Sequence, residues 1–89
     1  MDGQRNRSEL GAMRKDITRL NKLVNGITEK MKKKFISQSK LGYDGWDDHS
    51  RIPDVALQNK LLANVRRKDW VDVANLAAIL QYRQEKRKD

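Results

Sequence analysis

The side chains best suited to chemistry lie in an acidic stretch in the middle of the chain. Asp44, Asp47 and Asp48 supply three carboxylates within five residues, and carboxylate oxygens are the ligands that calcium prefers. The order of acids, central glycine and closing glutamate that defines an EF-hand loop is absent. A capping or turn role is therefore favoured for these carboxylates, and no metal site is expected.

A second polar pair, Asp72 and Asn75, is spaced three residues apart, so both side chains share one face of a helix. Asp69 is expected to cap that helix, which puts Asp72 in its first turn. A carboxylate there interacts favourably with the helix dipole and with free backbone amides. A structural role therefore explains the pair. His49 lies in a predicted loop without partners for a catalytic triad, and no catalytic residue is assigned.

The composition narrows the classes of site further. The chain has no cysteine and one histidine, which excludes a disulfide framework and a thiolate metal site, and a single histidine cannot make a conventional zinc site. No cofactor is expected. The first thirty residues contain no secretory apolar run, and no stretch approaches the roughly 20 apolar residues that span a bilayer. We expect a cytoplasmic protein without membrane contacts.

The net charge favours acidic partners. Twenty Lys and Arg against twelve Asp and Glu give +8 in 89 residues, which suits nucleic acid or an acidic protein surface. No recognition helix, RNP-like strand or zinc finger is identifiable, so contacts to phosphate are predicted and base-specific contacts are not. Two basic clusters are the candidate binding residues, with solvated helix ends as the alternative. They consist of Lys30, Lys32, Lys33, Lys34 and Lys40, and of Arg66, Arg67 and Lys68.

The strongest pattern is a heptad repeat in a long helix predicted over residues 9–41. Apolar residues alternate at spacings of three and four, and β-branched residues at the first seam position favour a parallel two-stranded coiled coil. A homodimer is therefore expected. The alternative is that this stripe, widened by Leu23, Phe35 and Ile36, packs against the rest of its own chain. The seam comprises Leu10, Met13, Ile17, Leu20, Val24, Ile27 and Met31.

The remaining elements flank this helix. Residues 1–8 are predicted to be a disordered arm, with Ser8 as the helix N-cap. Residues 42–52 are predicted to be an ordered turn, in which Trp46 is a buried pin. Both tryptophans, Trp46 and Trp70, are interpreted as core residues in preference to partner contacts.

A helical hairpin is predicted over residues 53–85, followed by a frayed tail over 86–89. No alternating strand pattern competes. The fold class expected is all-α, with a long N-terminal coiled-coil-type helix, a short turn and two packed shorter helices. The inward stripe of the first hairpin helix is predicted to comprise Val55, Leu57, Leu61, Leu62 and Val65.

Two short motifs resemble known families. The first combines a glycine-tryptophan-acid turn and an Asp-Val-Ala-Asn helix, carried by Gly42, Gly45, Trp46, Asp47, Asp69, Asp72 and Asn75. Residues 35–83, which contain both parts, resemble a small helical domain of bacteriophage and prophage proteins. That resemblance implies a phage-type accessory protein in a bacterial host, without a settled activity. Asp72 and Asn75 also look like the acidic helix of MazG-like nucleotide pyrophosphohydrolases, whose paired glutamates on an earlier helix are missing.

These observations favour a non-enzymatic, dimeric accessory protein. Its basic face is expected to bind nucleic acid or a nucleic-acid-handling complex of host defence or replication. One alternative is a truncated nucleotide pyrophosphohydrolase or nucleotide-binding remnant, in which the MazG-like resemblance implies magnesium at Asp72 and Asn75, with Asp47 as a further ligand. The other is a structural assembly subunit that docks through the heptad helix.

Overall fold

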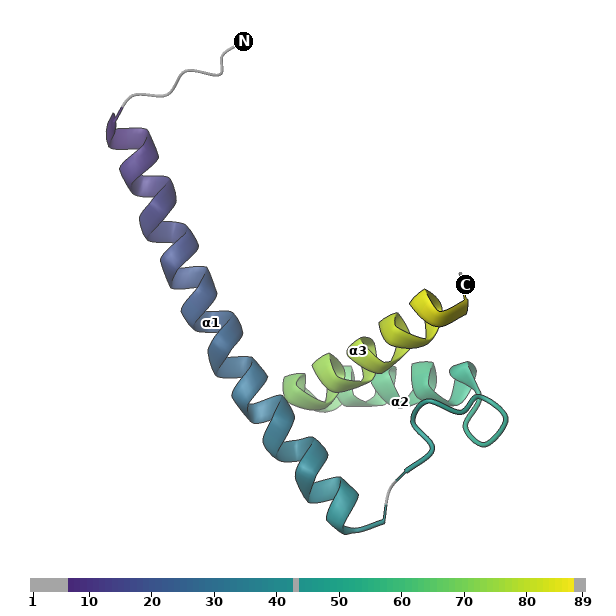
Figure 1. Ribbon diagram of the computed structural model, residues 1–89. Coiled ribbons are helices and arrows are strands. Elements are labelled where there is room, and N and C mark those ends of the chain that lie inside the picture. Colours follow the sequence, from purple (N-terminus) through teal and green to yellow (C-terminus); the bar gives the residue numbers. More distant parts are fainter. Residues whose placement is uncertain (1–6, 43, 88–89) are drawn as a thin grey trace.

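The computed structural model describes residues 7–42 and 44–87 and contains three α-helices (Figure 1). Helix α1 spans Arg7–Lys40, α2 spans Asp54–Arg67 and α3 spans Trp70–Arg87. Helices α2 and α3 pack against each other as a hairpin, and α3 also packs against α1. No strand occurs among the described residues. The predicted all-α class, with one long and two shorter helices, is confirmed.

The molecule is elongated because α1 extends well beyond the hairpin (Figure 1). Its radius of gyration is 17.9 Å, whereas a compact domain of this length has one of about 12 Å. Helix α3 contacts the C-terminal part of α1, and α2 makes no contact with α1. None of the helices in the described part of the chain is long and apolar enough to cross a membrane.

The start of α1 differs from the sequence prediction, whereas its end agrees with it. The helix begins at Arg7, so Ser8 lies in its first turn, and the predicted N-cap is wrong. Residues 1–6 of the predicted arm lie outside the described residues. At the other end, Gly42 has a φ of 86° and its N–H donates to the carbonyl of Ser39. A left-handed glycine ends a helix in this way because it lacks a Cβ.

The apolar core is small. Leu57 is the only large apolar side chain that is buried in the described chain. Of the predicted inward stripe on α2, Leu61 is half-buried, whereas Val55, Leu62 and Val65 are exposed. The prediction is wrong for these three because α2 is covered by α3 alone. A helix with one neighbour buries a narrower stripe than a helix packed on two sides.

The turn between α2 and α3 is tight and well bonded. Lys68 adopts a left-handed conformation with a φ of 61°, and its N–H donates to Val65 while the next N–H, of Asp69, donates to Asn64. This pair of bonds satisfies the last carbonyls of α2. The Asp69 carboxylate then accepts the N–H of Asp72 at 3.2 Å. Asp69 therefore caps α3, as predicted from the sequence.

Arg83 of α3 is the most deeply buried side chain, with 2% of its surface exposed. Its guanidinium donates to the carbonyl oxygens of Trp46 and Ile52, each at 2.8 Å, and to the carboxylate of Asp54 at 2.8 Å. A longer contact of 3.5 Å reaches the carbonyl of Gly45. These acceptors lie at both ends of the loop between α1 and α2. Arg83 thus fastens the loop to the hairpin.

Only arginine fits this position. A buried charge is costly unless it is paired and hydrogen-bonded, and the guanidinium has five N–H donors in a planar fan. A second arginine, Arg87, contacts the other carboxylate oxygen of Asp54 at 2.8 Å. This pair, together with Lys86 over the ring of Tyr82, accounts for α3 continuing through Arg87 where the sequence predicted a frayed tail.

Replacing Arg83 with alanine is expected to destabilise the hairpin and its loop by about 3 kcal/mol, because several buried acceptors lose their donor together. Arg83→Lys keeps the charge but not the fan, so an intermediate loss is expected. Urea unfolding followed by circular dichroism measures both. Equal stability of the wild type and Arg83→Ala would contradict the anchoring role.

Candidate functional site

The crossing of α1 and α3 places lysines of the first predicted basic cluster beside the residues that follow the second cluster in the chain. Lys30, Lys33, Lys34 and Ser37 of α1 line a shallow hollow with Asp69 and Val71 at the start of α3. The residues of the second cluster immediately precede Asp69 in the chain. We call this surface the basic junction, defined by Lys30, Lys33, Arg66, Arg67 and Lys68.

The members of the basic junction are exposed cations. In the described part of the chain none of the five forms an ion pair with a carboxylate. Unpaired cations of one sign that share a surface repel one another and attract polyanions. The basic junction is therefore the strongest candidate site for an acidic partner.

Lys34 has a different role from its neighbours. Its ammonium lies 3.3 Å from the carboxylate of Asp72 and 4.0 Å from that of Asp69. The contact ties α1 to the first turn of α3 and offsets one of the two carboxylate charges beside the basic junction. Of the predicted cluster, Lys34 is thus engaged within the chain.

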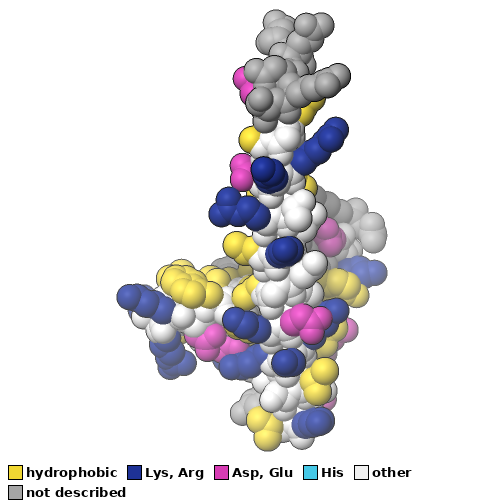
Figure 2. All heavy atoms as spheres, turned by 90° about the vertical axis from the view of Figure 1, so that its left-hand side faces the viewer, with side chains coloured by type: hydrophobic (Ala, Val, Ile, Leu, Met, Phe, Trp, Pro, Cys, Tyr) yellow, Lys and Arg dark blue, Asp and Glu magenta, His cyan; other side chains and the backbone are white. Residues whose placement is uncertain are grey.

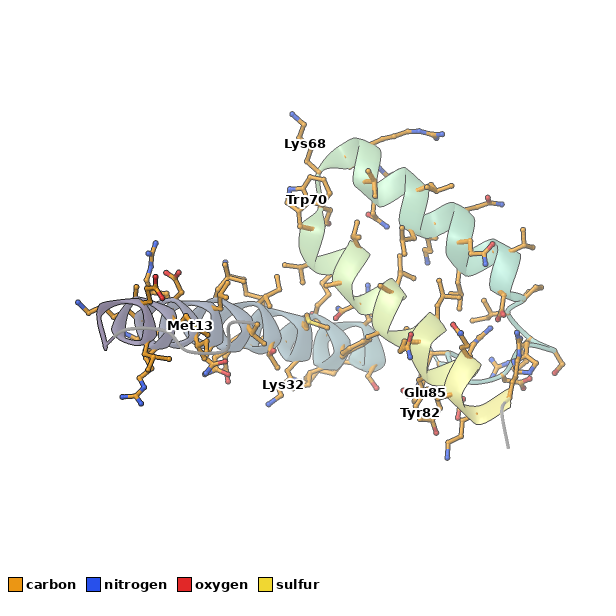
Figure 3. The ribbon with its side chains drawn as sticks, turned by 90° about the horizontal axis from the view of Figure 1, so that it is seen from above. Met13, Lys32, Lys68, Trp70, Tyr82 and Glu85 are labelled. Carbon is orange, nitrogen blue, oxygen red and sulfur yellow. The ribbon has the colours of Figure 1, made fainter. Side chains whose placement is uncertain are left out.

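Lys32 and Lys40 lie apart from the basic junction. A helix turns by about 100° per residue, which places Lys32 about 160° around α1 from Lys30 and about 100° from Lys33, on a different face. Figure 3 shows Lys32 on the side of α1 away from the turn between α2 and α3. Lys40 is the last residue of α1. Figure 2 shows the α1 side of the molecule, where Lys and Arg side chains are spread along the helix.

The proposed magnesium ligands are not brought together. Asp72 is paired with Lys34, and Asn75 is 4% exposed, with its Nδ2 atom donating to the carbonyl of Met31 at 3.4 Å. The Asn75 Oδ1 atom has no partner in the described chain. Asp47 follows Trp46, whose ring contacts Tyr82, and Tyr82 lies about 15 Å along α3 from Asp72. Asp47 therefore lies near the C-terminal end of α3, whereas Asp72 and Asn75 lie near its N-terminal end.

The acidic turn uses its carboxylates locally. The Asp48 carboxylate accepts the Ser50 hydroxyl at 2.6 Å and the Ser50 N–H at 2.9 Å, and these bonds lower the pKa of Asp48. Asp44 pairs with Arg51 at 2.9 Å. No group of three His, Cys, Asp or Glu residues within the described ranges could hold a metal ion. These contacts support a turn-forming role. Tyr43 lies outside the described residues.

Neither tryptophan is a buried core residue. The indole of Trp46 packs edge-on against Tyr82, with ring centroids 5.2 Å apart, yet Trp46 is 44% exposed. Trp70 is 56% exposed at the start of α3. The prediction that both are core residues is wrong, because the small hairpin leaves no interior space that could enclose an indole.

The heptad seam divides into two parts. Ile27 and Met31 are half-buried where α1 meets α3. The preceding five positions are all exposed, from 39% for Met13 to 58% for Leu20. The C-terminal end of the seam therefore packs against the chain's own α3, while the N-terminal half presents an apolar stripe to solvent. The five exposed positions are Leu10, Met13, Ile17, Leu20 and Val24.

Sequence reasoning missed two important residues. Arg83 falls within the predicted hairpin but is given no role there, because no local pattern distinguishes a buried arginine from an exposed one on a helix. Trp70 is predicted to be a core residue, whereas it is exposed because only a single layer covers the hairpin. Both assignments depend on which elements pack together, which the helical periodicity alone does not specify.

The fold and these surfaces define a small three-helix protein with a basic junction and an exposed apolar helix face. No family model matches the chain, and neither a curated protein nor a solved structure matches it.

Asp54 makes the stability of the hairpin depend on pH. Hydrogen bonding from Arg83, aided by Arg87, lowers the pKa of Asp54 below its ordinary value of about 4. This stabilisation is present above pH 4 and is lost as the pH falls through the lowered pKa. Asp54→Asn is expected to be less stable than the wild type at pH 7 and to lose less stability on acidification. Thermal unfolding at pH 7 and pH 3 measures the difference; parallel losses in the two proteins would contradict it.

Proposed function

We propose that this protein is a non-enzymatic accessory protein of the phage type, which dimerises through α1 and binds nucleic acid through the basic junction. The observation that carries the proposal is a set of five exposed cations on α1 and at the α2–α3 turn, none of which pairs with a carboxylate among the described residues. Phosphate contacts from Lys and Arg supply affinity that does not depend on base sequence. The basic junction needs no recognition helix for this kind of binding.

The exposed half of α1 supports dimerisation. The chain has an accessible surface of 7563 Å², whereas a compact monomer of 10.4 kDa has about 5,400 Å². A standard interface buries about 800 Å² on each partner. The surface that this chain exposes beyond that of a compact monomer is therefore large enough to include an interface with a second copy. An isolated helix of this composition is only marginally stable in water, and a partner along the seam stabilises it.

A second copy is the preferred partner because the seam is self-complementary. Ile17 and Val24 at the first seam position, with Leu20 at the second, suit a parallel two-stranded coil. In that arrangement Glu9 of one copy lies near Arg14 of the other. The alternative is a structural subunit that docks through the same stripe onto a larger assembly; a monomeric protein in solution would favour it.

The carboxylate and amide of the MazG-like motif have structural roles in this proposal. Asp72 neutralises Lys34, and Asn75 lies against α1. Both residues help to hold α1 at the angle that forms the basic junction. A protein partner with an acidic surface is the main competitor to nucleic acid, and the salt dependence of binding to naked nucleic acid separates the two.

The dimer is tested by placing charges in the seam. Ile17→Asp combined with Val24→Asp is expected to produce a monomer, because two carboxylates would be desolvated between the helices. Thr18→Asp combined with Asn25→Asp adds the same charges one position away, off the seam, and should leave the mass unchanged. Sedimentation equilibrium measures both. An unchanged dimer in the seam variant would show that another surface mediates association.

The basic junction is tested with two neighbouring lysines. Lys33→Gln is expected to lower the slope of log affinity against log salt by about one, corresponding to one lost phosphate contact. Lys32→Gln removes the same charge from the face of α1 that is turned away from the α2–α3 turn and should change the slope little. Fluorescence anisotropy with labelled oligonucleotides at several salt concentrations measures the slopes. Equal effects of the two variants would contradict the assigned surface.

A further inference from the structure

Trp70 is a large aromatic side chain left on the surface. It is 56% exposed, whereas Trp46 has Tyr82 as a ring partner. No aromatic partner of Trp70 occurs among the described residues. Figure 3 shows Trp70 beside Lys68 at the α2–α3 turn, at the opposite end of the hairpin from Tyr82 and Glu85. Burial within this chain therefore does not explain the indole.

The surroundings of Trp70 carry positive charge. Arg66, Arg67 and Lys68 precede it, and all three are exposed. The nearest carboxylate in the sequence, that of Asp69, accepts the Asp72 N–H and lies 4.0 Å from the Lys34 ammonium. Its charge is therefore partly offset. Trp70 thus combines an apolar ring face with cations on the same turn.

Trp70 lies between two residues that line the shallow hollow. Asp69 and Val71 do so together with Lys30 and Lys33, whereas Trp70 itself does not line it. The cations that directly accompany the indole are therefore those of the α2–α3 turn, and the lysines of α1 lie across the hollow from its two sequence neighbours.

We propose that Trp70 stacks on an unpaired base while the basic junction binds the neighbouring phosphates, so that the protein prefers single-stranded nucleic acid to duplex. This inference rests on the proposed function. Every base has a π-face, and aromatic stacking on it tolerates any sequence. In a duplex those faces are covered by neighbouring base pairs, whereas a single strand leaves them accessible. Stacking requires no base-specific contacts, which agrees with a sequence in which no base-reading element is identifiable.

The rival explanation for an exposed tryptophan is contact with another copy of the chain. The cations around the indole would repel the same cations of a second copy at this surface. Charge complementarity therefore favours a polyanion. The experiment includes a mass measurement so that the two explanations give different results.

The test uses Trp46→Phe, which keeps an aromatic ring at position 46 and leaves Trp70 as the only tryptophan. Titration with a single-stranded oligonucleotide at low salt is expected to quench its fluorescence, and a duplex of the same sequence should quench it weakly. Adding Trp70→Ala leaves no tryptophan, so binding is followed by the anisotropy of a labelled oligonucleotide, and single-strand binding should weaken by about tenfold, as expected for one lost stacked base. Trp70→Phe should retain most of the affinity. Circular dichroism verifies that each variant remains helical.

The outcomes separate this inference from the proposed function. If single strand and duplex bind alike and Trp70→Ala changes neither, the stacking role is wrong while binding through the basic junction stands. Absence of binding to either nucleic acid at low salt overturns both. A change in oligomeric mass in Trp70→Ala, without a change in single-strand affinity, assigns Trp70 to an interface between copies and overturns the stacking role.

Discussion

The bonds that Arg83 makes determine how the rest of the chain is arranged. With one buried large apolar side chain in its described part, the protein has little hydrophobic burial with which to hold a loop of irregular backbone. The guanidinium replaces that burial with directional bonds to Trp46, Ile52 and Asp54. Because Trp46 and Ile52 belong to the segment that connects α1 to α2, and Asp54 begins α2, the same side chain holds the connecting segment against the hairpin.

Polar contacts also fix the angle between α1 and α3. Lys34 reaches the first turn of α3, and Asn75 donates to the backbone of α1. The Oδ1 atom of Asn75 has no protein partner among the described residues, so its amide contributes one bond, through Nδ2, to the contact between the two helices. The two candidate surfaces lie apart. The exposed apolar stripe is on the N-terminal half of α1, and the basic junction is at the C-terminal part of α1 and the α2–α3 turn.

Much of the architecture could be predicted because it depends on local signals. The heptad spacing predicts a long helix, Gly42 predicts its end, and Asp69 predicts the start of α3, and each of these acts through the backbone near that residue. The placement of side chains between elements was harder to predict. A run of lysines in the sequence reads as one cluster, yet the helix turns Lys32 away, and the packing with α3 engages Lys34 in an ion pair. The burial of Arg83 and the exposure of Trp70 depend on a tertiary arrangement that has only one layer over the hairpin.

The length of α1 has a mechanical consequence. A helix of 34 residues is a rod of about 50 Å, and its contact with α3 lies in the C-terminal part, around Met31 and Lys34. Anything that holds the tip near Leu10 therefore acts on the junction through a long lever arm, so a small displacement at the junction becomes a wide sweep at the tip. Holding two tips side by side would conversely restrict the directions in which the two cationic surfaces can point. The free half of α1 then serves as an alignment device as well as an attachment surface.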